Sequence, residues 1–157
     1  MVTKNIFATV IAAQVLCALL ILTTATALAQ TATTAEARFY AQRGHERHAQ
    51  GRLMQAIADY DRALISEPRN AALFHARGLT WLALKDYGLA VRDFNQAIKL
   101  APDLAAAYAH RGLTRLWQGH EAKATDDFAR CFELDRSLRA YVEEMRSNGQ
   151  QRLTARR

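Results

Sequence analysis

The sequence has little cysteine: Cys17 and Cys131 are the two among 157 residues. Cys17 lies in an N-terminal segment that we expect to be removed, so the processed chain would keep one thiol and no disulfide of its own. Cys131 falls where a small core residue is expected, and we interpret it as a buried, inert thiol. The sequence therefore predicts a fold without disulfide crosslinks.

A catalytic or metal-binding motif is also missing. We find no glycine-rich phosphate loop and no hydroxyl nucleophile beside a credible base. His45-Glu46-Arg47-His48 resembles a metalloprotease motif, but its histidines are three residues apart where that motif needs four. His45, His48 and His75 would bind zinc or copper only if they converged, and no carboxylate or thiolate completes such a site. We therefore predict no enzymatic activity, cofactor or metal, and keep a histidine-based metal site as an alternative.

Lysine is scarce as well, with Lys4, Lys85, Lys99 and Lys123 the only examples. The net charge of +6 comes mainly from arginine and is spread along the chain, which does not predict a nucleic-acid-binding surface. Residues 148–157 contain Arg152, Arg156 and Arg157 without an acid, and we expect a disordered basic tail. Such a tail could contact anionic lipid or nucleic acid, although arginines near a terminus are more often solvated.

The segment 1–29 has the pattern of a secretory signal peptide. A positive start at Lys4 precedes an apolar run from Ile6 to Leu22, and Ala27-Leu28-Ala29 provides a small-residue cleavage site. We therefore expect cleavage after Ala29 and export to the bacterial periplasm. The alternative is a retained membrane anchor, although the run is short for a membrane-spanning helix. Residues 30–36 are interpreted as a flexible lead-in.

The rest of the chain repeats itself at a fixed interval, in the units 37–70, 71–104 and 105–138. Three kinds of residue recur, namely glycines that each follow an arginine, then alanines, then aromatics: Gly44, Gly78 and Gly112; Ala56, Ala90 and Ala124; Tyr60, Phe94 and Phe128. The middle unit predicts helices over Leu73–Leu84 and Gly88–Leu100. Two helices in each unit of fixed length indicate a helical solenoid. Because glycine is unfavourable inside a helix, we expect each one to lie against the alanine of its own unit, where the two backbones approach closely.

These residues resemble the tetratricopeptide repeat family. The likeness covers residues 37–138 and is most complete in the middle unit, which carries Phe74, Gly78, Trp81, Ala90, Phe94, Ala97 and Pro102. The end units depart from the family pattern at Arg47, Arg115, Cys131 and Arg136. The resemblance implies an all-α fold, a right-handed solenoid of antiparallel helix pairs.

Each unit also contains an arginine and an aspartate placed symmetrically about its turn. The pairs are Arg43 and Asp59, Arg77 and Asp93, and Arg111 and Asp127. In an antiparallel hairpin, residues equally far from the turn lie at one height, so we predict a bridge between the two helices of each unit. Arginine suits such a bridge because its guanidinium can bind a carboxylate with two hydrogen bonds. Solvated charges on each helix are the alternative.

The segment after the third unit predicts a capping helix over residues 137–146. Leu138, Tyr141, Val142 and Met145 recur at helical spacing on one face, and charged residues occupy the other. A solenoid needs a terminal element with a polar outer side to cover its last apolar edge. We expect Asn148-Gly149 to end this helix.

The first helices of the units carry a second stripe of residues. Its positions are Ala41, His45 and His48; His75, Leu79 and Leu82; and Ala109, Leu113 and Leu116. The resemblance places these positions on the concave surface where family members bind peptides. Chaperone-binding members hold a terminal carboxylate there with lysine and asparagine, and Ala41 and His45 do not fit that specificity. The leucines are either buried between repeats or available to a ligand, and we favour the ligand.

We therefore predict an exported, non-enzymatic adaptor that holds a peptide or helix of a partner protein in a concave groove. A membrane-tethered assembly factor and an oligomerisation surface are alternatives with the same features. We expect no nucleic acid partner, and membrane contact only if the N-terminal segment is retained. The sequence does not identify the partner.

Overall fold

The computed structural model describes Thr23, Thr31 and residues 33–154, with side chains as far as Asn148. The chain divides into two compact units, Met1–Glu36 and Ala37–Arg157. In the first unit the described residues are helical, including 33–36. The expected flexible lead-in is thus wrong at Thr31 and at 33–36, which are helical; Ala35 and Glu36 favour a helix, whereas the threonines do not. The expected signal segment lies outside the described residues, except for Thr23.

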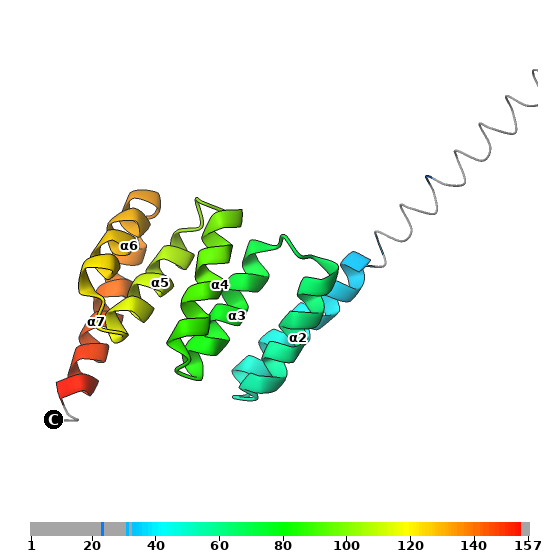
Figure 1. Cartoon of the computed structure of the whole chain (residues 1–157), viewed down its shortest axis with the longest axis horizontal. Coiled ribbons are helices and arrows are strands. Elements are labelled where there is room, and N and C mark those ends of the chain that lie inside the picture. The colour runs from blue at the N-terminus through cyan, green and yellow to red at the C-terminus, as the bar shows by residue number, and fades with distance from the viewer. Residues whose placement is uncertain (1–22, 24–30, 32, 155–157) are drawn as a thin grey trace, which may run out of the picture. The chain divides into compact units, whose positions relative to one another are not determined.

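The second unit is a row of antiparallel helix pairs (Figure 1). Helical residues 37–49 pair with α2, Leu53–Ser66. The next pairs are α3, Ala71–Ala83, with α4, Tyr87–Leu100, and α5, Ala105–Trp117, with α6, Glu121–Leu134; α7, Leu138–Thr154, follows. Each pair packs against the next through α2 with α3 and α4 with α5. The predicted all-α solenoid is confirmed. No helix in the described part of the chain is long and apolar enough to cross a membrane.

The turn inside each pair has the same backbone geometry. Gly51, Lys85 and Gly119 occupy equivalent positions in the three units and all have positive φ, at 72°, 64° and 82°. At each turn two backbone N–H groups donate back to the preceding helix, as Lys85 does to Leu82 and Asp86 does to Trp81 (both 2.9 Å). These bonds satisfy the last carbonyls of the first helix, and glycine adopts the required conformation most cheaply. Lys85 is therefore the strained member of the three.

The recurring glycines make room for aromatic rings. A Cβ added to Gly78 would lie 2.7 Å from Cε1 of Phe94, and the same clash arises between Gly44 and Tyr60 and between Gly112 and Phe128. The expectation that each glycine faces an alanine is therefore wrong about the neighbour. The alanines at Ala56, Ala90 and Ala124 are buried, and the residue that needs the missing side chain is the aromatic one helical turn further on.

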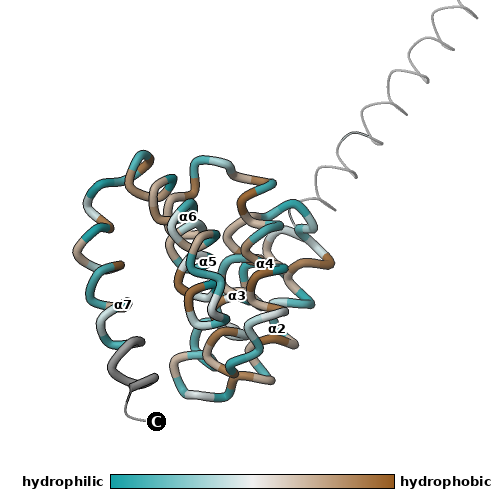
Figure 2. Tube along the Cα trace, turned by 60° about the vertical axis from the view of Figure 1, so that its left-hand side comes forward, coloured by the Kyte–Doolittle hydropathy of each residue, from teal (hydrophilic) through white to brown (hydrophobic). Residues whose placement is uncertain are grey.

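The capping helix is longer than its sequence predicted. It continues to Thr154, so Asn148-Gly149 does not end it, and the expected tail is helical over residues 148–154. Glutamate, methionine, arginine, glutamine and leucine on both sides favour a helix, which offsets the cost of one glycine, about 1 kcal/mol. Val142 is fully buried against the third pair, with Leu138 and Met145 packed around it. Figure 2 shows α7 as the outermost helix beside α5 and α6.

Candidate interaction face

Bidentate arginine–aspartate bridges join the two helices of each pair, as the sequence predicted. Arg77 donates from Nε and Nη2 to the two carboxylate oxygens of Asp93, both at 2.7 Å. Arg43 binds Asp59 and Arg111 binds Asp127 in the same way, with shortest distances of 2.6 Å. Donating these hydrogen bonds to Asp93 raises the pKa of Arg77 above its ordinary value. These bridges fix the two helices of each pair at one height.

The same arginines also connect neighbouring pairs. Nη1 of Arg77 donates to Asp61 on α2 (2.5 Å), and Nη1 of Arg111 donates to Asn95 on α4 (2.8 Å). Each arginine thus spans its own pair and the one before it. The sequence contained a signal for this contact, because Asp61 and Asn95 themselves occupy the same position in successive units.

The end pairs have a second arginine on the buried carboxylate. Arg47 reaches Asp59 at 2.8 Å, and Arg115 reaches Asp127 at 2.7 Å. The middle pair has Trp81 at this position, so among the described residues Arg77 is the one cation paired with Asp93. The departures from the family pattern at Arg47 and Arg115 therefore double the ion pair at both ends.

In the middle repeat the predicted stripe is partly open. Leu79 and Leu82 of α3 are neither buried nor fully exposed, and they belong to neither apolar cluster of the fold. His75, one turn before Leu79, is also partly buried. Leu79 and Leu82 form the apolar centre of the candidate interaction face, with His75 beside them.

In the third repeat the stripe is core. Leu113 is 1% exposed and Ala109 is fully buried, both in the cluster that contains Phe128 and Val142. Leu116 packs against the same cluster. The expectation that Leu113 faces a ligand is therefore wrong. The physical reason is α7, whose apolar residues cover this part of α5.

In the first repeat the predicted histidines are held by different neighbours. The Tyr60 hydroxyl is hydrogen-bonded to Nδ1 of the exposed His45 at 3.0 Å. His48 donates from Nδ1 to the Thr80 hydroxyl at 2.9 Å, because that hydroxyl itself donates to a carbonyl. Burial lowers the pKa of His48. The contact between His48 and Thr80 links the first repeat to the second along the stripe.

His75 does not join the other two histidines. Its Nε2 lies 3.0 Å from Nδ1 of His110, and Nε2 of His110 accepts from the Tyr141 hydroxyl at 3.1 Å. Nδ1 of His110 carries the ring hydrogen, because it donates to the carbonyl of Ala106 at 2.6 Å. Nε2 of His75 therefore has no lone pair opposite it to donate to and accepts a share of the same hydrogen. Burial lowers the pKa of His75 to about 4 and lowers that of His110. Sequence reasoning missed this chain of hydrogen bonds because His110 and Tyr141 are outside the stripe.

A metal site at these histidines does not follow from the geometry. Among the described residues, no group of three histidine, cysteine, aspartate or glutamate side chains is arranged to hold a metal ion. Cys131 is buried, and its pKa is raised by burial.

The stacked helix pairs, the capping helix and the arginine ladder, by which we mean the contacts of Arg77 with Asp61 and of Arg111 with Asn95, define a helical-repeat scaffold. Residues 71–104 match the family model described as the tetratricopeptide repeat. The fold is similar to the first tetratricopeptide domain of Spaghetti (RPAP3), solved with the HSP90 peptide SRMEEVD, at 25% identity and TM-score 0.69, over 77% of this chain and 95% of that chain. The second domain of the same protein, with the same peptide, is 30% identical, with TM-score 0.65, over 68% of this chain and 98% of that one.

A further similar structure is the second domain of human RPAP3 in complex with the HSP70 peptide SGPTIEEVD. It is 25% identical with TM-score 0.66, and the likeness covers 77% of this chain and 98% of that chain. A comparison with curated protein sequences gives no match. The chain belongs to the tetratricopeptide repeat family.

Proposed function

We propose that this protein is a non-enzymatic adaptor that binds a peptide or helical segment of a partner protein on the stripe of its first two repeats. The contact residues would be Leu79 and Leu82, flanked by His45, His48 and His75. One observation carries the proposal. Leu79 and Leu82 are partly open and belong to neither apolar cluster, whereas Leu113, equivalent to Leu79, is buried in the cluster that contains Val142 of α7, and the partly buried Leu116 packs against that cluster.

The structural relatives support this assignment. The RPAP3 domains bind short chaperone peptides, so a scaffold of this size is sufficient for peptide recognition. This chain has Ala41 and His45 where chaperone-binding members clamp a terminal carboxylate. Its ligand would therefore be recognised by apolar side chains set against the two leucines, with hydrogen bonds to the histidines.

The size of the open stripe limits the affinity. With the third repeat covered by α7, a bound segment would contact about two repeats. Such an interface falls at or below the low end of specific protein–protein interfaces, about 1,200 Å² in total. Affinity for an isolated segment should then be about micromolar, with a few buried side chains supplying most of it.

We also propose that the protein is exported and cleaved after Ala29. The support is the charge, apolar run and Ala27-Leu28-Ala29 site of the N-terminal sequence. Intact-mass analysis of protein from its native cells should give a chain that begins at Gln30. A full-length species in the inner membrane would favour the membrane-tethered alternative.

Site-specific photo-crosslinking tests the binding face. A photoreactive amino acid replaces Leu82 in the full chain, and the crosslinked partner is identified by mass spectrometry. The same group at Met54, an exposed residue on α2, serves as the control. The proposal predicts one dominant partner at position 82 that Leu79→Arg abolishes. Equal crosslinking at both positions, or no effect of Leu79→Arg, would contradict it.

A further inference from the structure

The interface between α6 and α7 is built differently from the earlier contacts between repeats. Three arginines occupy positions where the preceding repeats have rigid or small residues. Arg136 stands where the chain has Pro68 and Pro102, Arg139 where it has Ala71 and Ala105, and Arg146 where it has Gly78 and Gly112. Gly78 and Gly112 make room for the aromatic ring of their own pair, whereas Arg139 and Arg146 extend over the Phe132 and Phe128 rings of α6.

The ladder contact between repeats is also missing here. Arg77 and Arg111 reach back to Asp61 and Asn95 of the preceding helix. The corresponding residues of α7 and α6 are Met145 and Ala129, which cannot form that hydrogen bond. The result is a cleft of about 770 Å³, whose lining includes Phe128, Phe132, Arg136, Arg139 and Arg146. The cleft is open to solvent, so it suits a segment that lies along the surface better than an enclosed small molecule.

The cleft combines an aromatic floor with cationic walls. The Arg139 guanidinium lies 4.5 Å from the centre of the Phe132 ring, and that of Arg146 lies 5.5 Å from the centre of Phe128. Stacking on a ring leaves the edges of a guanidinium free to donate to a carboxylate. The aromatic floor thus orients the arginines without neutralising them.

The charges on these arginines are only partly matched within the protein. Neither Arg136 nor Arg139 has a side-chain hydrogen bond or ion pair among the described residues. Arg146 has two long hydrogen bonds to Glu143, at 3.3 and 3.4 Å, and its covered Nε–H has no acceptor among the described residues. Glu133 lines the cleft but is paired with Arg130 at 2.9 Å. The cleft therefore has excess positive charge.

The spacing of the arginines selects the kind of anion. Arg139 and Arg146 are two turns apart on α7, or about 10 Å along the helix axis. Their guanidinium groups lie over two different rings, Phe132 and Phe128, so two anionic groups match them better than one phosphate or sulfate. A peptide in the extended polyproline II conformation has three residues per turn and a rise of about 3.1 Å per residue, so it places side chains three residues apart on one face at about 9 Å. A nucleic acid strand fits less well, because the rings on which its bases would stack are already covered by guanidinium groups.

We propose that the cleft between α6 and α7 binds an acidic peptide segment of a partner protein. One carboxylate of the segment binds Arg136 and Arg139, and another, three residues further on, binds Arg146. None of the stripe residues lines this cleft, so the site is separate from the one on the first two repeats. The protein would then hold two segments at once.

Fluorescence anisotropy with the full chain tests the proposal. The probe is a fluorescein-labelled extended peptide with glutamate at every third residue, and the matched probe has glutamine instead. We expect a Kd of about 10–100 μM for the glutamate peptide at low salt, weakening as salt is added. Arg139→Glu and Arg146→Glu should each raise the Kd at least tenfold. Arg136→Glu changes a turn residue outside the helices and should act in the same way while sparing the fold.

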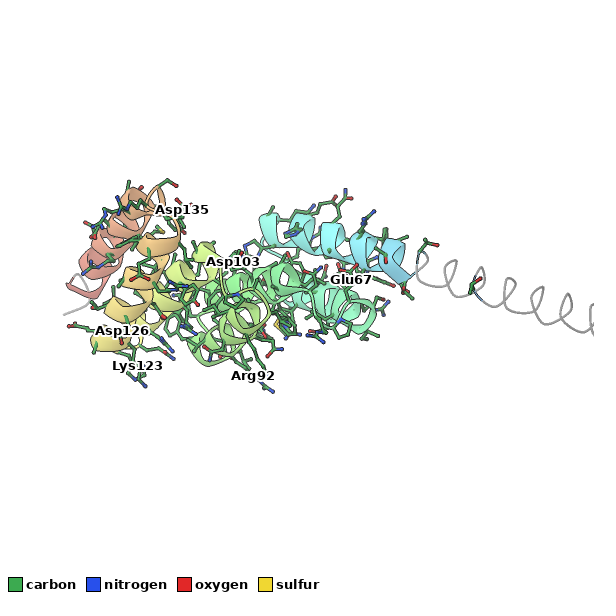
Figure 3. The ribbon with its side chains drawn as sticks, turned by 90° about the horizontal axis from the view of Figure 1, so that it is seen from above. Glu67, Arg92, Asp103, Lys123, Asp126 and Asp135 are labelled. Atoms are coloured by element: carbon green, nitrogen blue, oxygen red, sulfur yellow. The ribbon has the colours of Figure 1, made fainter. Side chains whose placement is uncertain are left out.

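Arg92→Glu is the matched control, since it makes the same charge change at a site on α4 outside the cleft. Figure 3 shows Arg92 pointing away from the helices. The Kd of Arg92→Glu for the glutamate peptide should stay within twofold of that of the unchanged protein. Leu79→Arg should also leave the Kd for this peptide unchanged. The proposal is overturned if Arg92→Glu weakens binding as much as Arg139→Glu or if the glutamine peptide binds equally well. Tighter binding of a short oligothymidylate, full competition by millimolar inorganic phosphate, or no binding of either peptide would also overturn it.

Discussion

The three arginine–aspartate bridges differ in how far each buried carboxylate depends on one arginine. In the part of the chain that the structure describes, Asp93 forms an ion pair with Arg77 alone, whereas Asp59 pairs with both Arg43 and Arg47. Removing Arg77 leaves a carboxylate that is 5% exposed with no cation beside it. Breaking a buried pair in this way costs about 3–5 kcal/mol. We therefore expect Arg77→Ala to lower the free energy of unfolding by about 3 kcal/mol or more.

The end pairs should respond more weakly to the same change. In Arg111→Ala, Asp127 keeps a 2.7 Å bond to Arg115, so the buried charge remains compensated. The expected loss is about 1 kcal/mol, the value of the hydrogen bonds removed. Removing Arg111 and Arg115 together should cost more than the sum of the single changes, because only then is Asp127 left alone. Asp61→Ala tests the exposed side of Arg77 and should cost less than about 1 kcal/mol.

Urea unfolding followed by circular dichroism measures these differences, with the m-value checked for each variant. The expected order of cost is Arg77→Ala first and Arg111→Ala and Arg43→Ala well below it. An equal cost in all three would refute the reasoning, because it would mean that the second arginine at the end pairs gives no compensation. Additive losses for the Arg111 and Arg115 changes would refute it in the same way.

Three further perturbations follow from the packing, the turns and the histidines. Gly78→Ala should destabilise the fold by about 2 kcal/mol in the same urea titration, because the new Cβ would lie 2.7 Å from Phe94. Gly88→Ala is the control and should be neutral, because the nearest atom to its new Cβ would be 3.7 Å away. Lys85→Gly should raise the free energy of unfolding by roughly 0.5–1 kcal/mol, because it relieves a positive φ of 64°. His75, with its pKa lowered to about 4, contributes stability that is fully present above pH 6.5 and is lost as the pH falls towards 4. The loss should be about 2 kcal/mol by pH 5 and should shrink in His75→Gln; a pH profile that this change does not alter would contradict the assignment.

Much of the fold could be predicted because the chain repeats. The fixed interval between units showed which glycines, aromatics and charged residues are equivalent, and the symmetric positions of Arg77 and Asp93 about their turn predicted the bridge between them. The same reasoning was wrong about Leu113. Sequence equivalence treats it like Leu79, but the packing of α7 on α5 buries one and not the other.

Other features depended on tertiary contacts that no short pattern encodes. The histidine chain joins His75, His110 and Tyr141 from three different helices, and no repeated position in the sequence marks it. The extension of α7 past Gly149 reflects the helical preference of its neighbours, which outweighs a residue that often ends a helix. The partner of each glycine was missed because an alanine and an aromatic one turn apart lie on the same side of the second helix.

Calorimetric titration tests most directly whether a partner segment binds on the partly open stripe. Crosslinking first identifies the segment, which is then titrated into the full chain and into the Leu79→Arg variant. The account predicts a Kd of about micromolar for the unchanged protein and a loss of at least roughly 30-fold, about 2 kcal/mol, in the variant. Helix content and urea midpoint should be nearly unchanged in Leu79→Arg, whereas Leu113→Arg should unfold the third repeat. An unchanged affinity in a folded Leu79→Arg protein would contradict the account, because the binding surface would then lie elsewhere.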